Sequence, residues 1–291
     1  MSALQSAETT PELRTGRTAV RPGSRVTIGE IVSGGILLLL AIAAIAPWAI
    51  APGDPLAISP SEAFSAPSLT HPFGTDESGR DVFTRVIHGA QSSLLIGVSA
   101  TAIGVGLALI LGTLGGLGTP AVDFSVTRLT EVLFALPGLL LALVFIAIAG
   151  PGIVTTTVAV GLSTAPGYAR IIRSQIRSVR SSAFVEAAVV LGHGPSRILL
   201  RHILPNAIAP IFVLATLGVG QAIVWASSLS YLGLGAVPPA AEWGSMLSVG
   251  RTYINVAWWM TVFPGLFIVL AAASATALGR SMQARTRQVN R

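Results

Sequence analysis

The stretch Glu186-Ala187-Ala188-Val189-Val190-Leu191-Gly192, followed by Ile203-Leu204-Pro205-Asn206, is a short break in a chain that is otherwise rich in long apolar runs. Gly192 can take the left-handed backbone conformation that ends a helix, so a first helix is expected over about residues 183–191. A second helix can begin at Pro195, where the missing N–H costs nothing, and is expected to end before Pro205. The sequence therefore predicts two short helices joined by a tight bend.

The composition is that of an integral membrane protein. Of the 291 residues, 52% are hydrophobic and only 10% are charged, whereas soluble domains carry about 25% charged residues. The chain has no cysteine, which excludes disulfides, thiolate metal sites and cysteine nucleophiles. All 18 basic residues are arginine, and a phosphate-binding loop of the Gly-Lys-Ser/Thr type needs a lysine. If ATP drives this protein, another polypeptide hydrolyses it.

Uncharged runs predict six membrane spans, since a helix needs about 20 apolar residues to cross a bilayer. The first run is 31–53. A cleavable signal peptide is the alternative, with Ala-Ile-Ala at 44–46 as its cleavage site, but the apolar core is too long and the leader too extended. The other spans are expected at about 92–114, at two places within 132–169 separated by Gly150-Pro151-Gly152, at about 207–228 and at about 258–278.

These spans divide the chain into a cytoplasmic tail, a first helix and a larger core. The tail is 1–30, the first transmembrane helix 31–53 and an extracytoplasmic loop 54–91. A five-helix core, 92–279, contains the two short helices of residues 182–206, and a cytoplasmic tail, 280–291, ends the chain. Within the core, the Gly115-Gly116 and Gly118-Thr119-Pro120 breakers are expected to end the second span, and a short polar hairpin is expected at 123–131.

The loop 54–91 is rich in proline, serine and aspartate, and it ends in an amphipathic segment. Val82, Phe83, Val86, Ile87 and Ala90 share one helical face, which predicts a helix lying at the membrane interface. A metal site built from the carboxylates of Asp76, Glu77 and Asp81 is an alternative, but the EF-hand spacing is missing. The favourable interaction of acids with the positive end of a helix dipole explains these three carboxylates without a metal.

The arginines predict the orientation in the membrane. With the arginine-rich segments in the cytoplasm, only Arg80, Arg85 and Arg251 of the 18 lie outside, as the positive-inside rule favours. Both termini and residues 170–205 are then cytoplasmic, while 54–85 and 229–255 face outside. Arginines at steps of three and four after residue 169 share one helix face, which predicts either a lipid-headgroup contact or a direct contact with a partner subunit. The candidates are Arg173, Arg177 and Arg180.

The Glu-Ala-Ala sequence, the glycine four positions after its second alanine and the later Ile-Leu-Pro-Asn together resemble the EAA loop of the membrane subunits of binding-protein-dependent ABC importers. The version with Arg201-His202 before Ile203 resembles the dipeptide, oligopeptide and nickel permease branch, in its second-type (C-like) subunit. Gly74-Thr75-Asp76, Gly79-Arg80-Asp81 and Ser92-Ser93-Leu94 resemble the same branch. The resemblance covers about residues 70–290.

This resemblance implies an all-α permease of the type I ABC importer fold in the bacterial plasma membrane, with no catalytic residue and no cofactor. It implies four kinds of contact: a sister permease subunit, two ATP-binding subunits, an extracytoplasmic solute-binding protein and membrane lipid. Coupling to the ATPase is then expected at Glu186, Ala187, Ala188, Gly192, Leu204 and Pro205. Peptides, nickel complexes and other small solutes all remain open as substrates.

The predicted spans lack the residues that two other classes of membrane protein would need. None of the six predicted spans contains an ionisable side chain, which argues against the runner-up, a stand-alone secondary transporter or channel. A membrane-embedded enzyme would need a nucleophile or metal motif that the chain lacks. Nucleic acid is not expected as a partner, because the arginines lie beside apolar segments. Polar residues in the spans either line a pathway or pack helices together; the pathway candidates are Thr156, Ser163, Gln221 and Ser227.

Overall fold

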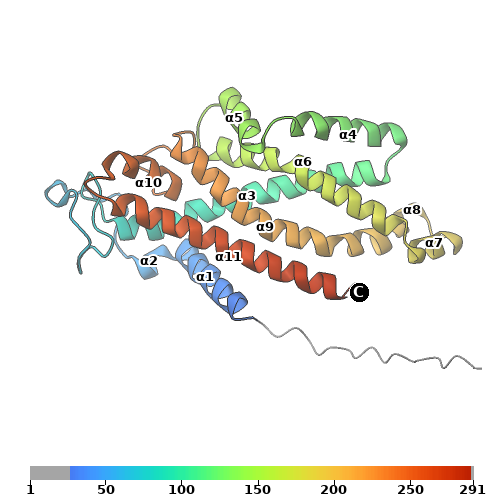
Figure 1. Ribbon diagram of the computed structural model, residues 1–291, viewed down its shortest axis with the longest axis horizontal. Helices are drawn as coiled ribbons and strands as arrows, with labels where there is room; N and C mark the ends of the chain where they lie inside the picture. Colours follow the sequence, from blue (N-terminus) through green and yellow to red (C-terminus); the bar gives the residue numbers. More distant parts are fainter. Residues whose placement is uncertain (1–26, 290–291) are drawn as a thin grey trace, which may run out of the picture.

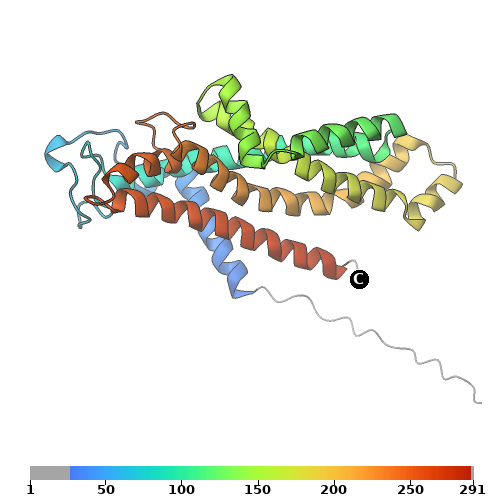
Figure 2. The ribbon, with the colours of Figure 1, turned by 45° about the horizontal axis from the view of Figure 1, so that its top comes forward.

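The computed structural model describes residues 27–289, and within them it is all-helical, without a β-strand. Four long helices, α3, α6, α9 and α11, run side by side along the long axis (Figure 1, Figure 2). The loop after α2 and helix α10 lie at one end, and α7 and α8 lie at the other. The α-helices are α1 Ile28–Ile45, α2 Pro47–Ile50, α3 Val82–Leu117, α4 Pro120–Phe134, α5 Gly138–Ala149, α6 Ile153–Arg180, α7 Ala183–Val190, α8 Pro195–Ile198, α9 Leu204–Tyr231, α10 Trp243–Gly250 and α11 Trp259–Val289.

Four of these helices are long and apolar enough to cross a membrane: α1, α3, the part of α9 over Ile211–Tyr231 and the part of α11 over Trp259–Arg285. Helices α4 and α5 meet at an angle of 89° and count as a fifth span if the bent pair is one. Helix α6 has 28 residues, but threonines, serines and arginines interrupt its apolar surface. The apolar candidates therefore number four or five, rather than the predicted six.

Glycines on α3 let the neighbouring helices approach closely. A Cβ at Gly112 or Gly116 would lie 2.7 Å from Ile172 or Ile176 of α6, and one at Gly97 would lie 2.4 Å from Ile223 of α9. Small residues allow the same close backbone approach in membrane helix pairs generally. The expectation that Gly115-Gly116 ends this helix is wrong, because α3 continues to Leu117.

Other predicted boundaries also differ from the structure. Residues 82–91 are the first turns of α3 and not a separate interfacial helix; Asp81 caps α3 by accepting the Thr84 N–H at 2.8 Å. The expected polar hairpin at 123–131 is part of the 15-residue helix α4. The first apolar run does not stay one helix to residue 53, because Pro47 cannot continue α1 and begins α2.

The turn expected at Gly150-Pro151-Gly152 is present between α5 and α6. At the C-terminus, residues 280–289 of the predicted tail continue α11. The predicted N-terminal tail lies outside the described residues as far as residue 26, and so do residues 290–291.

Candidate functional site

The segment predicted to couple to an ATPase, residues 182–206 and called here the coupling loop, begins with helix α7 and turns at Gly192. Gly192 has φ +74°, the left-handed conformation that glycine adopts most easily. Its N–H donates to the Val189 carbonyl at 2.9 Å, and the His193 N–H donates to the Ala188 carbonyl at 3.1 Å. These bonds satisfy the carbonyls at the end of α7. The bend predicted at Gly192 is present, with α7 ending at Val190.

The second half of the coupling loop does not end before Pro205. Helix α8 runs through a π-helical turn, Leu199–Ile203, directly into α9. In that turn the Leu204 N–H donates to the Leu199 carbonyl, five residues back. Pro205 then lies in the first turn of α9, where a helix needs no N–H donor from it. The expectation of a helix end is wrong because the π-turn places the proline at a new helix start, so the helical backbone continues from the loop into α9.

One side of the coupling loop is anchored and the other faces outward. Val185 is buried in a cluster with α6 and α9 side chains, including Val179 and Ala207, and Ala188 is also buried. At the tip, Val189, Val190 and Leu191 are 58%, 88% and 74% exposed. The tip is therefore an apolar surface that no described residue covers.

The other predicted coupling residues lie around this tip. Glu186 and Ala187 are exposed, and the Glu186 N–H donates to the Ser182 carbonyl at 3.1 Å. Leu204 is half-buried, and Pro205 is exposed. Behind the loop, a cavity of about 560 Å³ is lined by Glu186, Arg180 and His193 among others.

Two of the three candidate arginines on α6 have an acidic partner inside the chain. Asp123, in the first turn of α4, faces both of them: one carboxylate oxygen pairs with Arg173 and the other with Arg177, at 2.5 Å for Arg177. Arg180 donates to the Gly116 carbonyl at 3.4 Å. From the sequence, this aspartate is only part of the expected polar hairpin. No local sequence pattern shows that an acid at a helix start pairs with arginines about fifty residues away.

The four predicted pathway residues divide into two pairs. Ser163 and Gln221 line a cavity between α6, α9 and the corner where α4 meets α5. Thr156 instead donates to the Leu234 carbonyl at 2.9 Å, and Ser227 is buried where Gly244 of α10 packs against it. The structure thus brings Ser163 and Gln221 together and leaves the other two in helix packing.

Comparison with known proteins decides the family. A family model described as "Binding-protein-dependent transport system inner membrane component" matches residues 104–288. The chain belongs to this permease family. It is a membrane subunit of an ABC importer and not an enzyme.

Relatives of this permease cover most of its length. It is 39% identical over 264 residues to the di/tripeptide transport system permease protein DppC of Pseudomonas aeruginosa, covering 86% of this chain and 85% of the relative. It is 41% identical over 249 residues to the glutathione transport system permease protein GsiD of Shigella flexneri, covering 85% and 82%.

Solved structures support the fold. A structure titled "Crystal structure of an amino acid ABC transporter with histidines" matches with TM-score 0.56 and 18% identity, covering 70% of the permease and 94% of that chain. The MetNI methionine ABC transporter in an inward-facing form matches with TM-score 0.54 and 17% identity, covering 69% and 96%. At these identities the likeness concerns the fold alone.

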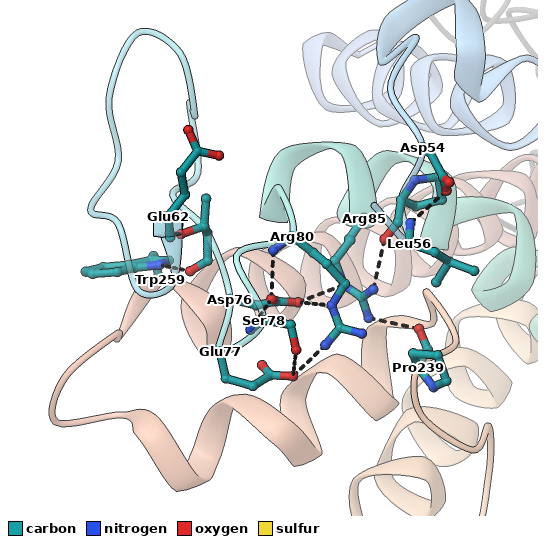
Figure 3. Close-up of polar contacts among 12 residues, drawn as sticks. Asp54, Leu56, Glu62, Asp76, Glu77, Ser78, Arg80, Arg85, Pro239 and Trp259 are labelled. Carbon is teal, nitrogen blue, oxygen red and sulfur yellow. Dashed lines mark hydrogen bonds and ion pairs between the residues drawn. The ribbon is translucent and has the colours of Figure 1, made fainter. Parts of the chain in front are cut away.

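At the opposite end of the permease, a buried ionic cluster holds the loop after α2. Asp76 accepts from Arg80 Nε at 2.7 Å and lies 3.5 Å from Arg85 Nε (Figure 3). Arg85 also donates to the carbonyls of Pro55 and Pro239, at 3.0 and 3.2 Å. Asp76 and its neighbour Glu77 are thus neutralised by arginine, and Asp81 caps α3, so the alternative of a metal site from these three carboxylates has no support.

Glu242 is the functional candidate that sequence reasoning missed. It is buried and caps α10, accepting the Gly244 and Ser245 N–H groups at 2.8 Å each, and Ser93 of α3 donates to it at 3.3 Å. Burial raises the pKa of Glu242 above its ordinary value, although these hydrogen bonds act in the opposite direction. The sequence signal was present: an acid placed directly before an apolar segment is typical of a helix N-cap.

Proposed function

We propose that this permease is the second-type subunit of an ATP-driven peptide importer and forms half of its translocation pathway. Relatives of similar length are named as permeases for di/tripeptides and glutathione, a tripeptide-like solute. Nickel complexes remain the alternative solute for this branch. The observation that carries the coupling part of the proposal is the exposed apolar tip of a loop whose helical backbone continues into α9.

In this proposal the α4–α5 pair and α6 each count as a span, which makes six with α1, α3, α9 and α11. Both termini and the coupling loop are cytoplasmic, and the ionic cluster around Asp76 is extracytoplasmic. The assembly contains a sister permease, two ATP-binding subunits and a solute-binding protein. Glu186, Ala187, Ala188, Gly192, Leu204 and Pro205 form or support the contact with the ATPase.

Binding of the ATPase is tested with a bulky side chain at the exposed position Ala187. We expect Ala187→Trp to abolish ATP-dependent uptake of a labelled dipeptide by the reconstituted importer and to reduce co-purification of the ATPase. The level of the subunit in the membrane should be unchanged, because Ala187 is exposed and a larger side chain there displaces nothing in the chain. Ser174→Trp, at an exposed position of α6, is the matched control and should keep both properties.

The same preparation separates the alternative function classes. The permease alone should show no saturable labelling by a nucleotide photoprobe, since it has no lysine for a phosphate-binding loop. A stand-alone transporter would move solute in liposomes that contain only this chain. Such uptake, or full uptake by Ala187→Trp with the ATPase bound, would overturn the proposal.

A further inference from the structure

The cavity at the α4–α5 corner has about 260 Å³ of space and is bounded by α6 and α9. Helix α5 projects away from the bundle at this corner in both views (Figure 1, Figure 2). Ser163, Tyr168, Gln221 and Trp225 supply its polar and aromatic walls. None of its lining residues in the described part of the chain is charged.

Two glycines leave room for the aromatic side chains of the cavity wall. A Cβ at Gly218 would lie 2.7 Å from the Tyr168 hydroxyl, and one at Gly138 would lie 2.3 Å from the Trp225 ring. Either methyl group would push an aromatic side chain out of its position. The glycines therefore give the two rings the room that they occupy in the cavity wall.

The polar walls offer both kinds of hydrogen-bonding group. The Ser163 hydroxyl donates to the Val160 carbonyl at 3.0 Å, which leaves its oxygen lone pairs as acceptors. The Tyr168 hydroxyl lies 3.5 Å from Gln221 Oε1 and donates toward it, which leaves the two N–H groups of the Gln221 amide as donors. An uncharged donor beside an uncharged acceptor complements a peptide group, which presents one N–H and one C=O.

We propose that this cavity is a peptide-contacting subsite that binds the backbone amide of the transported solute and does not discriminate by side-chain charge. This inference rests on the proposed function, in which the solute is a peptide. A fixed charge here would attract one class of side chain and repel the other, because Coulomb interactions in a partly buried site are only weakly screened. The uncharged lining lets acidic, neutral and basic peptides pass this point with the same ease.

The test introduces a charge into the subsite of the complete reconstituted importer. Uptake is measured for three dipeptides of equal length, with a basic, a neutral or an acidic second residue, and each rate is divided by its wild-type value so that selection by the solute-binding protein cancels. We expect Gln221→Glu to raise the basic-to-acidic uptake ratio by about tenfold or more, and Gln221→Lys to lower it by a similar factor.

Phe212→Glu is the matched control, because it places the same charge at an exposed position of α9 outside the cavity, about two and a half turns away. It should leave the ratio unchanged. Ser163→Asp, on the α6 wall, is the second variant and should act like Gln221→Glu even if Gln221 cannot be replaced without loss of the protein.

Each outcome has a separate meaning. Unchanged ratios in the Gln221 and Ser163 variants, with uptake preserved, would overturn the subsite, and so would an equal shift in Phe212→Glu. If the wild-type importer takes up none of the three dipeptides, the proposed peptide function fails instead.

Discussion

Gly192 is the residue on which the geometry of the coupling loop depends. A Cβ there would meet no atom within 4 Å, and the backbone has φ +74°, so a side chain is opposed by backbone conformation and not by crowding. A residue other than glycine pays about 1–2 kcal/mol for the left-handed conformation. We expect Gly192→Val to abolish uptake while the subunit reaches the membrane at normal abundance and the solute-binding protein still captures its ligand.

Gly194 provides the matched control for this substitution. It also has open space around its Cβ position, but its φ is −66°, which any residue adopts. Gly194→Ala should therefore keep uptake. Uptake, membrane level and co-purified ATPase are measured together. Full transport by Gly192→Val with the ATPase bound would show that the loop is a structural hairpin with no part in coupling.

At the scale of elements, Asp123 joins α4 to α6. Its two carboxylate oxygens pair with arginines one turn apart on α6, and α6 leads directly into the coupling loop. We expect Asp123→Asn to lower the unfolding temperature of the purified permease, since both arginines lose their anionic partner, and Asp123→Glu to restore part of the loss. Glu131→Gln removes the exposed pair with Arg128 on the same helix and should change little. Equal effects of the two neutral variants would contradict this role.

The stability of the folded permease depends on pH through Glu242, the residue that caps α10. Burial raises the pKa of Glu242, so the folded state holds its proton at a higher pH than the unfolded state does. The stability from this group is fully present below the ordinary carboxyl pKa and is lost as the pH rises through the raised value. Thermal unfolding in detergent should show this decline, and Glu242→Gln should flatten it because the amide does not titrate. A decline of the same size in the variant would assign it to another group.

For the whole molecule, the testable property is its orientation in the membrane. The arginine distribution predicts that the loop after α2 faces outside and the coupling loop faces the cytoplasm. The chain has no cysteine, so an introduced cysteine is the one residue that a thiol reagent labels. A membrane-impermeant thiol reagent should label Leu69→Cys, a fully exposed position, in intact cells. It should label Ser196→Cys, also exposed, only after permeabilisation. The reverse pattern would invert the topology.

The sequence predicted the helical class, the bend at Gly192 and the turn after α5, because apolar runs, glycine and proline act locally. It failed where a distant contact overrides a local signal. Gly115-Gly116 reads as a break, yet α6 side chains pack against these glycines and the helix continues. Pro205 reads as a helix end, yet the π-turn before it makes it a helix start. The Asp123 pairs and the hydrogen bond from Ser93 to Glu242 join residues far apart in sequence, and no local pattern encodes such pairs.

The apolar tip of the coupling loop also bears on how the cell makes this protein. Three neighbouring aliphatic side chains are exposed when the subunit is alone, and an exposed apolar cluster is either an interaction site or an aggregation liability. In the proposed assembly the ATPase covers this tip, so we expect a copy synthesised without its ATPase to aggregate more readily than one synthesised with it. On this proposal, the subunit depends on balanced synthesis of its complex to stay soluble in the membrane.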